Sequence, residues 1–368
     1  MLNPGRESFV RVSPALVVVV ALVAAVVCLA VVSVASAGAR PAEAQEEGSP
    51  PRAPAATGGK EKAYALGDGN PIIYKSKDSR PGFAGGPYEH KIECPEGYKA
   101  IGGGFDLNNP GNKNLNKTYW QIYESFPYKG GDTWSVVAYG HTYLNYSLPT
   151  FTAYAACAPE ELLSGFRYTW VEDRRVWPNE TTMIWSKCES DERAIAGGFR
   201  FSSGVKLVRN ERSREDERSW GTGAKLINND KGIHFLSSTT VCVSRGALED
   251  TRYLEDQDTS HEAPADSRAV ANTKSCQQGT YLLSGGAGFS DGTNALWSNS
   301  SPPHQGAQSW KASAIAKEKD GWFGFKPITV HAFALCGRFA EQPGAGDGKL
   351  SGKNPGWGDG MGGGRFKK

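Results

Sequence analysis

The sequence contains Cys94-Pro95-Glu96-Gly97-Tyr98-Lys99-Ala100-Ile101-Gly102-Gly103-Gly104-Phe105, a stretch that recurs twice more along the chain. The second copy opens at Cys188 and continues through Ala194-Ile195-Ala196-Gly197-Gly198-Phe199. The third opens at Cys276 and continues through Leu282-Leu283-Ser284-Gly285-Gly286-Ala287-Gly288-Phe289. Self-similarity of this kind indicates three copies of one structural unit.

Each copy goes on to one aligned tryptophan and closes with an apolar segment that ends in cysteine. The tryptophans are Trp134, Trp220 and Trp310, and the closing cysteines are Cys157, Cys242 and Cys336. The two cysteines of a copy are 63, 54 and 60 residues apart, so the copies have nearly the same length. Because repeated positions usually serve a shared fold, we expect the three tryptophans to lie in the core.

The residues between these landmarks favour strands. Trp134-Ser135-Val136-Val137-Ala138-Tyr139 alternates between apolar and polar residues with a period of two, as a half-buried strand does. The pattern predicts about four short antiparallel strands in each unit, and residues 71–75, 167–171 and 252–255 each supply an extra opening strand. We therefore predict an all-β fold with three repeated antiparallel β units.

Two arrangements of the three units are open. They could pack into one pseudo-threefold, β-prism-like domain, or they could form three small β-sandwich modules. A unit of this length is marginally stable alone, which favours joint packing.

The six repeated cysteines predict one disulfide in each unit. Six cysteines allow 15 pairings in principle. Every copy must close in the same way, which favours the pairs Cys94–Cys157, Cys188–Cys242 and Cys276–Cys336. The sequence has no short-spaced cysteine or histidine pair of the kind that binds zinc, so we expect neither a metal nor a cofactor.

The ends of the chain differ in composition from the repeats. Arg6 and Arg11 precede an apolar run that ends in small residues, which predicts a signal peptide or an N-terminal membrane anchor over residues 1–39 and hence export. Residues 40–69 resemble a disordered linker, and the Gly-rich residues 341–368 resemble a disordered tail. The repeats are expected at residues 70–160, 161–245 and 246–340.

Charge and motifs argue for binding rather than catalysis. Lysine and arginine number 41 against 39 acidic residues, and this balance gives no electrostatic reason to expect nucleic acid. No metalloprotease or serine-hydrolase motif is present, and no histidine occupies the same place in all three copies. The charged run 212–218 is interpreted as a hairpin tip. A secreted hydrolase acting on polysaccharide is the alternative, with Glu172 and Asp173, or Glu255 and Asp256, as its carboxylates.

The first unit is unusually rich in aromatic residues. Flat rings with polar tips suit sugar rings or protein partners, and Tyr139, His141 and Tyr143 would alternate onto one face of a strand. The candidate ligand-binding residues are Tyr119, Trp120, Tyr123, Tyr139, His141 and Tyr143. The expected function is that of a secreted or envelope-associated binding or structural protein whose partner is a cell-surface glycan or an envelope protein. Membrane contact is expected only through an uncleaved N-terminal segment.

The repeat resembles a cysteine-bounded module that recurs in secreted actinobacterial proteins of unassigned function. The resemblance rests on the Cys-Pro-x-Gly opening, the glycine run, the Trp strand and the closing Ala-Tyr-Ala-Ala-Cys, and it covers roughly residues 70–340. The second copy departs from it, because neither the proline nor the glycine follows Cys188. More loosely, the triplication is similar to the vitelline membrane outer layer family, which has three sheets in a β-prism. These resemblances imply an extracellular role related to carbohydrate and bring no catalytic residues.

Overall fold

The structure is a computed structural model of the whole chain. It describes residues 61–65, 70–79, 85–109, 118–128, 130–142, 146–178, 180–226, 232–259, 268–289, 295–302, 308–316 and 328–340. All of these residues belong to one structural unit, Arg52–Lys368. The expected signal peptide or anchor (1–39) and the expected tail (341–368) lie outside the described residues.

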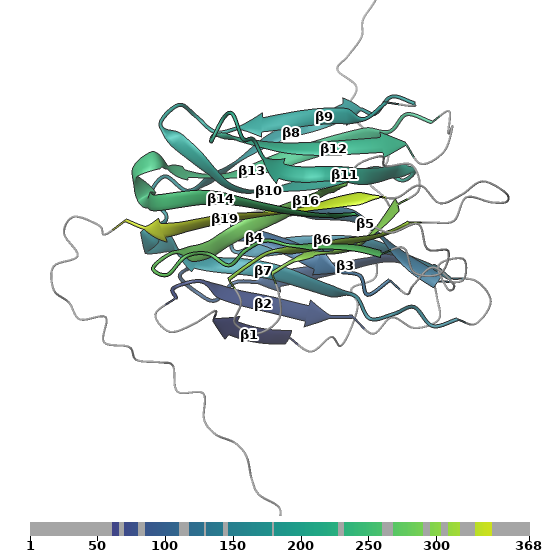
Figure 1. The fold of residues 1–368 in the computed structure, drawn as a ribbon, viewed down its shortest axis with the longest axis horizontal. Coiled ribbons are helices and arrows are strands. Elements are labelled where there is room, and N and C mark those ends of the chain that lie inside the picture. The colour runs from purple at the N-terminus through teal and green to yellow at the C-terminus, as the bar shows by residue number, and fades with distance from the viewer. Residues whose placement is uncertain are drawn as a thin grey trace, which may run out of the picture. The chain divides into compact units, whose positions relative to one another are not determined.

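Within the described residues each repeat contains six strands, and all pairings between strands are antiparallel. Figure 1 shows the fold that these strands form. Repeat 1 contains β2 (Ile73–Asp78), β3 (Gly86–Glu93), β4 (Tyr98–Asp106), β5 (Thr118–Pro127), β6 (Thr133–Thr142) and β7 (Thr152–Pro159). Repeat 2 contains β8 (Arg167–Arg175), β9 (Thr182–Lys187), β10 (Glu192–Phe201), β11 (Val205–Arg212), β12 (Ser219–Leu226) and β13 (Phe235–Ser244). Repeat 3 contains β14 (Leu248–Thr259), β15 (Arg268–Asn272), β16 (Tyr281–Phe289), β17 (Ala295–Ser301), β18 (Lys311–Ala316) and β19 (Thr329–Phe339). The short 3₁₀ turns Glu160–Leu162 and Arg245–Ala247 connect the repeats.

The three sheets combine strands from different repeats. Sheet A has the order β1-β2-β7-β4-β17-β18-β15, sheet B has β3-β6-β5-β10-β13-β8, and sheet C has β14-β19-β16-β11-β12-β9. Each sheet therefore joins three strands of one repeat to three strands of another. Sheet A joins repeats 1 and 3, sheet B joins repeats 1 and 2, and sheet C joins repeats 2 and 3. A single cluster of buried residues draws on every repeat. The all-β, pseudo-threefold prediction is confirmed, and three separate sandwiches are ruled out because no repeat forms its sheets alone.

The glycine-bearing strands β4, β10 and β16 meet at the centre of this arrangement. A Cβ added to Gly102 would lie 3.2 Å from the Cβ of Ser284 and 3.5 Å from that of Ala196. The Ser284 hydroxyl donates a hydrogen bond to the carbonyl of Ile195. Small residues at these three equivalent positions therefore let the three repeats approach one another closely.

The first glycine of each Gly-Gly pair accommodates the aligned tryptophan. An added Cβ would lie within 2.3 Å of the indole at Gly103, 2.1 Å at Gly197 and 2.1 Å at Gly285. The indoles are buried as predicted, and each Nε1 donates to a polar side chain on a neighbouring strand. These acceptors are Ser125 at 3.0 Å from Trp134, Asn210 at 2.7 Å from Trp220 and Ser300 at 3.2 Å from Trp310.

The second glycine of each pair lies where two repeats join within one sheet. Here an added Cβ would meet a backbone carbonyl of the other repeat, at 2.2, 2.3 and 2.0 Å for Gly104, Gly198 and Gly286. The joined strands pair over only two residue pairs, at β4–β17, β10–β5 and β11–β16. We call each of these junctions a seam, and the missing side chain is what allows the backbones to come together there.

The three disulfides form as predicted, and each joins two sheets. Cys94, which follows β3, is bonded to Cys157 in β7 and links sheets B and A. Cys188–Cys242 links sheets C and B, and Cys276–Cys336 links sheets A and C. Disulfides of this kind indicate that the protein folds in an oxidising compartment.

Two expectations about strands need correction. Residues 61–65, placed in the linker, form β1 (Glu61–Ala65), which pairs with β2 and is held by the Lys75–Glu61 ion pair at 2.7 Å and by stacking of Tyr64 on Tyr74. Within the part of the chain that the structure describes, each repeat also has six strands rather than about five. The missed strands, β3, β9 and β15, lie ahead of the opening cysteines. Their sequences lack a clear alternation of apolar and polar residues, since β9 contains Met183-Ile184-Trp185 and β15 contains Ala269-Val270-Ala271 in unbroken runs.

A buried histidine makes stability depend on pH. His90 in β3 is 1% exposed, and neither ring nitrogen forms a hydrogen bond within the part of the chain that the structure describes. Burial, with a smaller effect of Lys77, lowers the pKa of His90 to about 4. The unfolded imidazole titrates near pH 6.5, so this contribution to stability is complete above pH 6.5 and is lost as the pH falls towards 4.

We therefore expect the free energy of unfolding to fall between pH 7 and pH 4 by about 3 kcal/mol more than in a His90→Leu variant. Urea denaturation at a series of pH values measures both proteins. Parallel pH profiles for the two proteins would contradict the assignment to His90.

Candidate functional site

Four predicted ligand-binding residues come together on β5 and β6 of sheet B. Strand register pairs Tyr119 with His141, and their rings stack at 4.4 Å between centroids. Tyr139 lies 4.8 Å from His141, and Tyr123 contacts Tyr139 edge to face at 6.1 Å. Tyr139 and His141 lie on the face opposite the buried Trp134, which we call the outer face of the sheet. We call these four residues the Tyr–His cluster.

The rings of the Tyr–His cluster are half-buried, and each ring carries a polar group that can form hydrogen bonds. Burial, reinforced by the neighbouring Tyr119 and Tyr139, raises the pKa of Tyr123 to about 12, so that this phenol stays protonated at physiological pH. Tyr123 also packs against Phe201 at 5.6 Å, across the seam between repeats 1 and 2. The cluster therefore offers uncharged ring faces together with hydroxyl groups that can donate and accept hydrogen bonds.

Charged side chains border the cluster on the same face. Glu124 pairs with Arg200 at 3.0 Å across the seam. Burial raises the pKa of Glu124 despite this partner. Glu89 accepts a hydrogen bond from Ser135 at 3.2 Å and pairs with Lys91 at 3.4 Å. The edge of the cluster is therefore polar, while its centre is aromatic.

Trp120 does not belong to the site. It is fully buried, its Nε1 donates to the Pro149 carbonyl at 2.8 Å, and its ring packs against Tyr88 and Phe151. Alternation along β5 turns Trp120 towards the core because it turns Tyr119 outward. Tyr143, the sixth predicted residue, lies outside the described residues.

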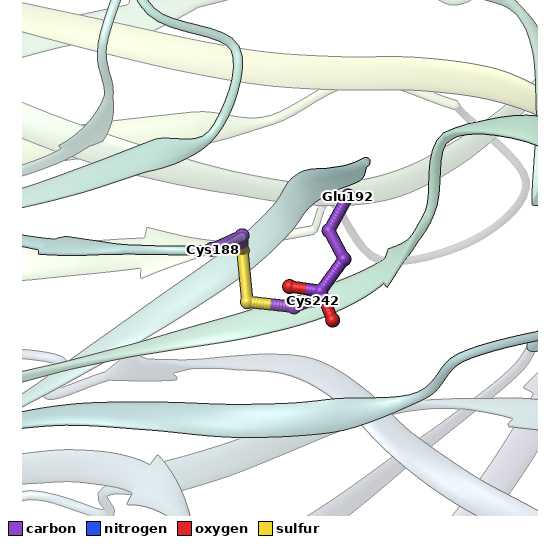
Figure 2. A group of neighbouring side chains, drawn as sticks. All are labelled: Cys188, Glu192 and Cys242. Atoms are coloured by element: carbon purple, nitrogen blue, oxygen red, sulfur yellow. A yellow bond between two sulfur atoms is a disulfide. The ribbon is translucent and has the colours of Figure 1, made fainter. Parts of the chain in front are cut away.

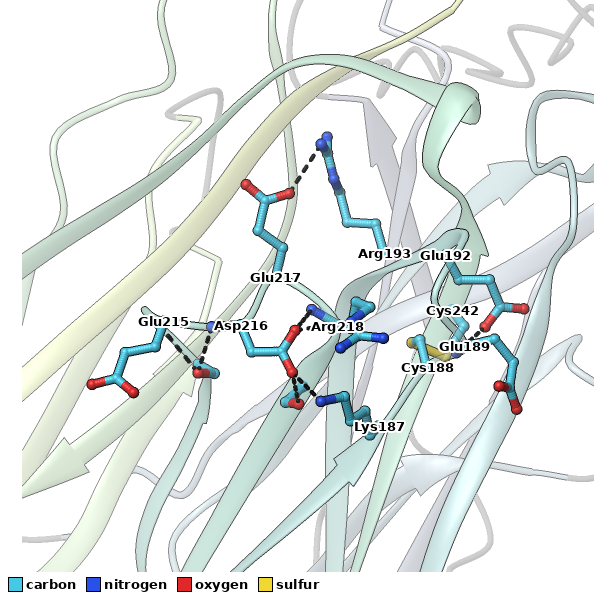
Figure 3. A network of polar contacts seen from close by, with 12 residues as sticks. Lys187, Cys188, Glu189, Glu192, Arg193, Glu215, Asp216, Glu217, Arg218 and Cys242 are labelled. Carbon is cyan, nitrogen blue, oxygen red and sulfur yellow. Dashed lines mark hydrogen bonds and ion pairs between the residues drawn. A yellow bond between two sulfur atoms is a disulfide. The ribbon is translucent and has the colours of Figure 1, made fainter.

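The charged run 212–218 forms the turn between β11 and β12, as predicted, and its contacts with Lys187 and Arg193 fasten the hairpin to β9 and β10 (Figure 3). The Asp216 carboxylate accepts hydrogen bonds from Arg218 and Ser219 and pairs with Lys187 at 2.5 Å. The contact with Lys187, followed by these hydrogen bonds, holds the pKa of Asp216 well below its usual range. Because every one of these contacts is internal, we interpret the network as structural.

Cys188, Glu192 and Cys242 are close enough together to suggest a metal site (Figure 2). The two sulfurs form a disulfide, however, and metals bind the thiolate. The Glu192 carboxylate is engaged by Arg167, whose Nε and a terminal nitrogen donate to it at 2.5 and 2.6 Å. The hydrogen bonds from Arg167 lower the pKa of Glu192. We therefore interpret this group as a disulfide beside the Arg167–Glu192 ion pair and not as a metal centre.

The carboxylates considered for hydrolysis do not form a pair at Glu255 and Asp256. Adjacent residues on a strand point to opposite faces. Accordingly, Glu255 lies against His331 at 3.3 Å, whereas Asp256 accepts a hydrogen bond from the backbone of Asn272 at 3.2 Å. Glu172 and Asp173 are adjacent residues of β8, at a point where the register between β8 and β13 shifts.

Three exposed tryptophans in repeat 2 were not among the predicted site residues. Trp170, Trp177 and Trp185 are 40%, 50% and 43% exposed. Trp170 packs edge to face on Phe126, Arg175 covers Trp177 at 4.3 Å, and Trp185 lies over Gly221. Unlike Trp134, Trp220 and Trp310, these three tryptophans do not recur at aligned positions in the other repeats, and this difference is the sequence signal that could have marked them as surface residues.

The part of the chain that the structure describes contains no helix long and apolar enough to cross a membrane. Comparison with known protein-family models and with curated proteins finds no match to this chain.

Proposed function

We propose that the protein is an exported binding protein that recognises a cell-surface or envelope saccharide through the Tyr–His cluster. The observation that carries this proposal is the contact among the rings of Tyr119, Tyr139 and His141 on the outer face of sheet B. Aromatic rings held in this way can stack on the apolar face of a sugar without losing side-chain freedom on binding.

The surroundings of the cluster support this choice of ligand. The cluster contains no lysine, arginine, aspartate or glutamate, so it suits an uncharged sugar better than a strongly charged partner. Three disulfides fit a protein that works outside the reducing cytoplasm, where surface glycans are found. The expected export segment at residues 1–39 agrees with the same location.

A glycan array followed by calorimetry tests the proposal with the purified protein. We expect Tyr139→Ala and His141→Ala each to weaken saccharide binding about tenfold or more, because each removes a stacking surface. Tyr128→Ala is the matched control, since Tyr128 is an exposed tyrosine just beyond the other end of β5. Binding that survives both cluster variants would rule out this site, and release of new reducing ends from a polysaccharide would favour the hydrolase alternative.

A further inference from the structure

A groove of about 270 Å³ opens on the outer face of sheet C, where repeats 2 and 3 join. It is lined by Thr181, Met183, Val208, Arg209, Phe289 and His331. Strand register places Met183, Gly223, Arg209, Gly288 and His331 in one row across the sheet. We call this depression the seam groove. It is separate from the Tyr–His cluster, which lies on another sheet.

The pseudo-symmetry explains why the groove exists. In each sheet a β-bulge next to the seam places one residue at an equivalent position: Tyr123 in sheet B, Val208 in sheet C and Ser298 in sheet A. In sheet B the large Tyr123 ring fills this place and packs against Phe201. In sheet C the smaller Val208 does not fill the equivalent space. Phe289, which occupies the position of Phe201, therefore lines an open groove.

A second difference between sheets B and C, at the positions of Glu124 and Arg200, opens the groove further. Sheet B carries Arg200 opposite Glu124, and the two form an ion pair across the seam. Sheet C carries Gly288 at the position of Arg200 and Arg209 at that of Glu124. Arg209 lies over Gly288, where an added Cβ would be 3.3 Å from its Nε. The seam of sheet B is therefore closed by a salt bridge, whereas the seam of sheet C carries an arginine side chain at the equivalent place.

Arg209 and His331 are each oriented by a neighbouring carboxylate. The Nε of Arg209 lies 2.8 Å from Glu211, whose carboxylate is buried, and the Arg209 side chain is still 40% exposed. His331 is oriented through Nδ1 by Glu255 at 3.3 Å, and Arg214 pairs with the same carboxylate. Glu211 therefore positions Arg209, and Glu255 positions His331. The side chains of Arg209 and His331 both border the groove.

The groove combines these two polar groups with an apolar wall made by Met183, Val208 and Phe289. Arginine matches the geometry of a carboxylate, and an apolar wall suits the hydrophobic face of a sugar ring. The volume lies just below the range of about 300–1,000 Å³ that is usual for drug-sized ligands, so it suits a single sugar ring. We propose that the seam groove binds a carboxylated sugar residue of an acidic saccharide, with the carboxylate against Arg209 and His331.

Calorimetry tests this with uronic acid oligomers (galacturonate, glucuronate and alginate types), each beside its methyl ester and with inorganic phosphate as a simple anion. We expect at least one free acid to bind tenfold or more tightly than its ester. Failure of all three acids, equal binding of acid and ester, or equally tight binding of phosphate would each overturn the proposal.

The residues at the equivalent positions of sheet B suggest two variants of the seam groove. Val208→Tyr inserts the residue that sheet B carries at this place, so the fold should accommodate it, and we expect it to reduce uronate binding at least tenfold. His331→Ser likewise introduces the residue found at the equivalent Ser237, with an expected loss of about tenfold. Tyr139→Ala in the Tyr–His cluster should leave uronate binding unchanged, which separates this site from the first. Full uronate binding by both groove variants would contradict the assignment, and His331→Ser keeps the test decisive if Val208→Tyr fails to fold.

Discussion

Replacing Gly286 with valine is expected to destabilise the protein by at least about 4 kcal/mol. The first added carbon would lie 2.0 Å from the backbone oxygen of Asn210, so the two backbones must separate. Strands β16 and β11 pair over only two residue pairs at this seam, and their separation breaks the connection between repeats 2 and 3. Chemical denaturation followed by circular dichroism measures the effect.

Gly246→Val is the matched control for this prediction. An added Cβ at Gly246 would meet nothing within 4 Å, so its cost should stay below about 1 kcal/mol. The pseudo-symmetry extends the expectation to Gly104→Val and Gly198→Val, which face a backbone carbonyl in the same way. A loss at Gly286 no larger than that at Gly246 would mean that the seam does not hold the repeats together.

The local features of the repeat could be predicted from the sequence because each reflects chemistry that recurs three times. The cysteine pairing and the burial of Trp134, Trp220 and Trp310 are confirmed. The exchange of strands between repeats is harder to predict. It depends on which backbone lies against the second glycine of each pair, and a glycine in a sequence does not reveal its neighbour.

The candidate site could be predicted only in part, for a geometric reason. The pattern places Tyr139 and His141 on one face, and the structure brings Tyr119 and Tyr123 to them. Trp120 was misassigned because an aromatic-rich strand does not reveal which of its two faces is buried. The seam groove arises from side chains that are small or absent, namely Val208 and Gly288, and a missing side chain becomes visible only beside its larger equivalent in another sheet.

Reduction of all three disulfides is expected to unfold the protein or to leave it barely folded at 25 °C. The bonds close loops of 63, 54 and 60 residues, and each loop contributes about 4 kcal/mol in the chain-entropy model. The three loops follow one another without overlap, so their constraints on the unfolded chain are independent and should add. A total of about 12 kcal/mol equals most of the stability of a typical domain.

Alanine replacement of each cysteine pair, singly and together, tests this additivity by urea denaturation. Each single replacement should cost about 4 kcal/mol, and any two should cost about twice that, because no loop contains another. The bonds also join the sheets in a closed ring, A to B, B to C and C to A, so the native state could hold its shape with any one bond missing. If a single removal cost far more than 4 kcal/mol, the bond would be acting on the native packing of the two sheets. Equal costs for all three bonds would place the effect in the unfolded chain, where the three loops are alike.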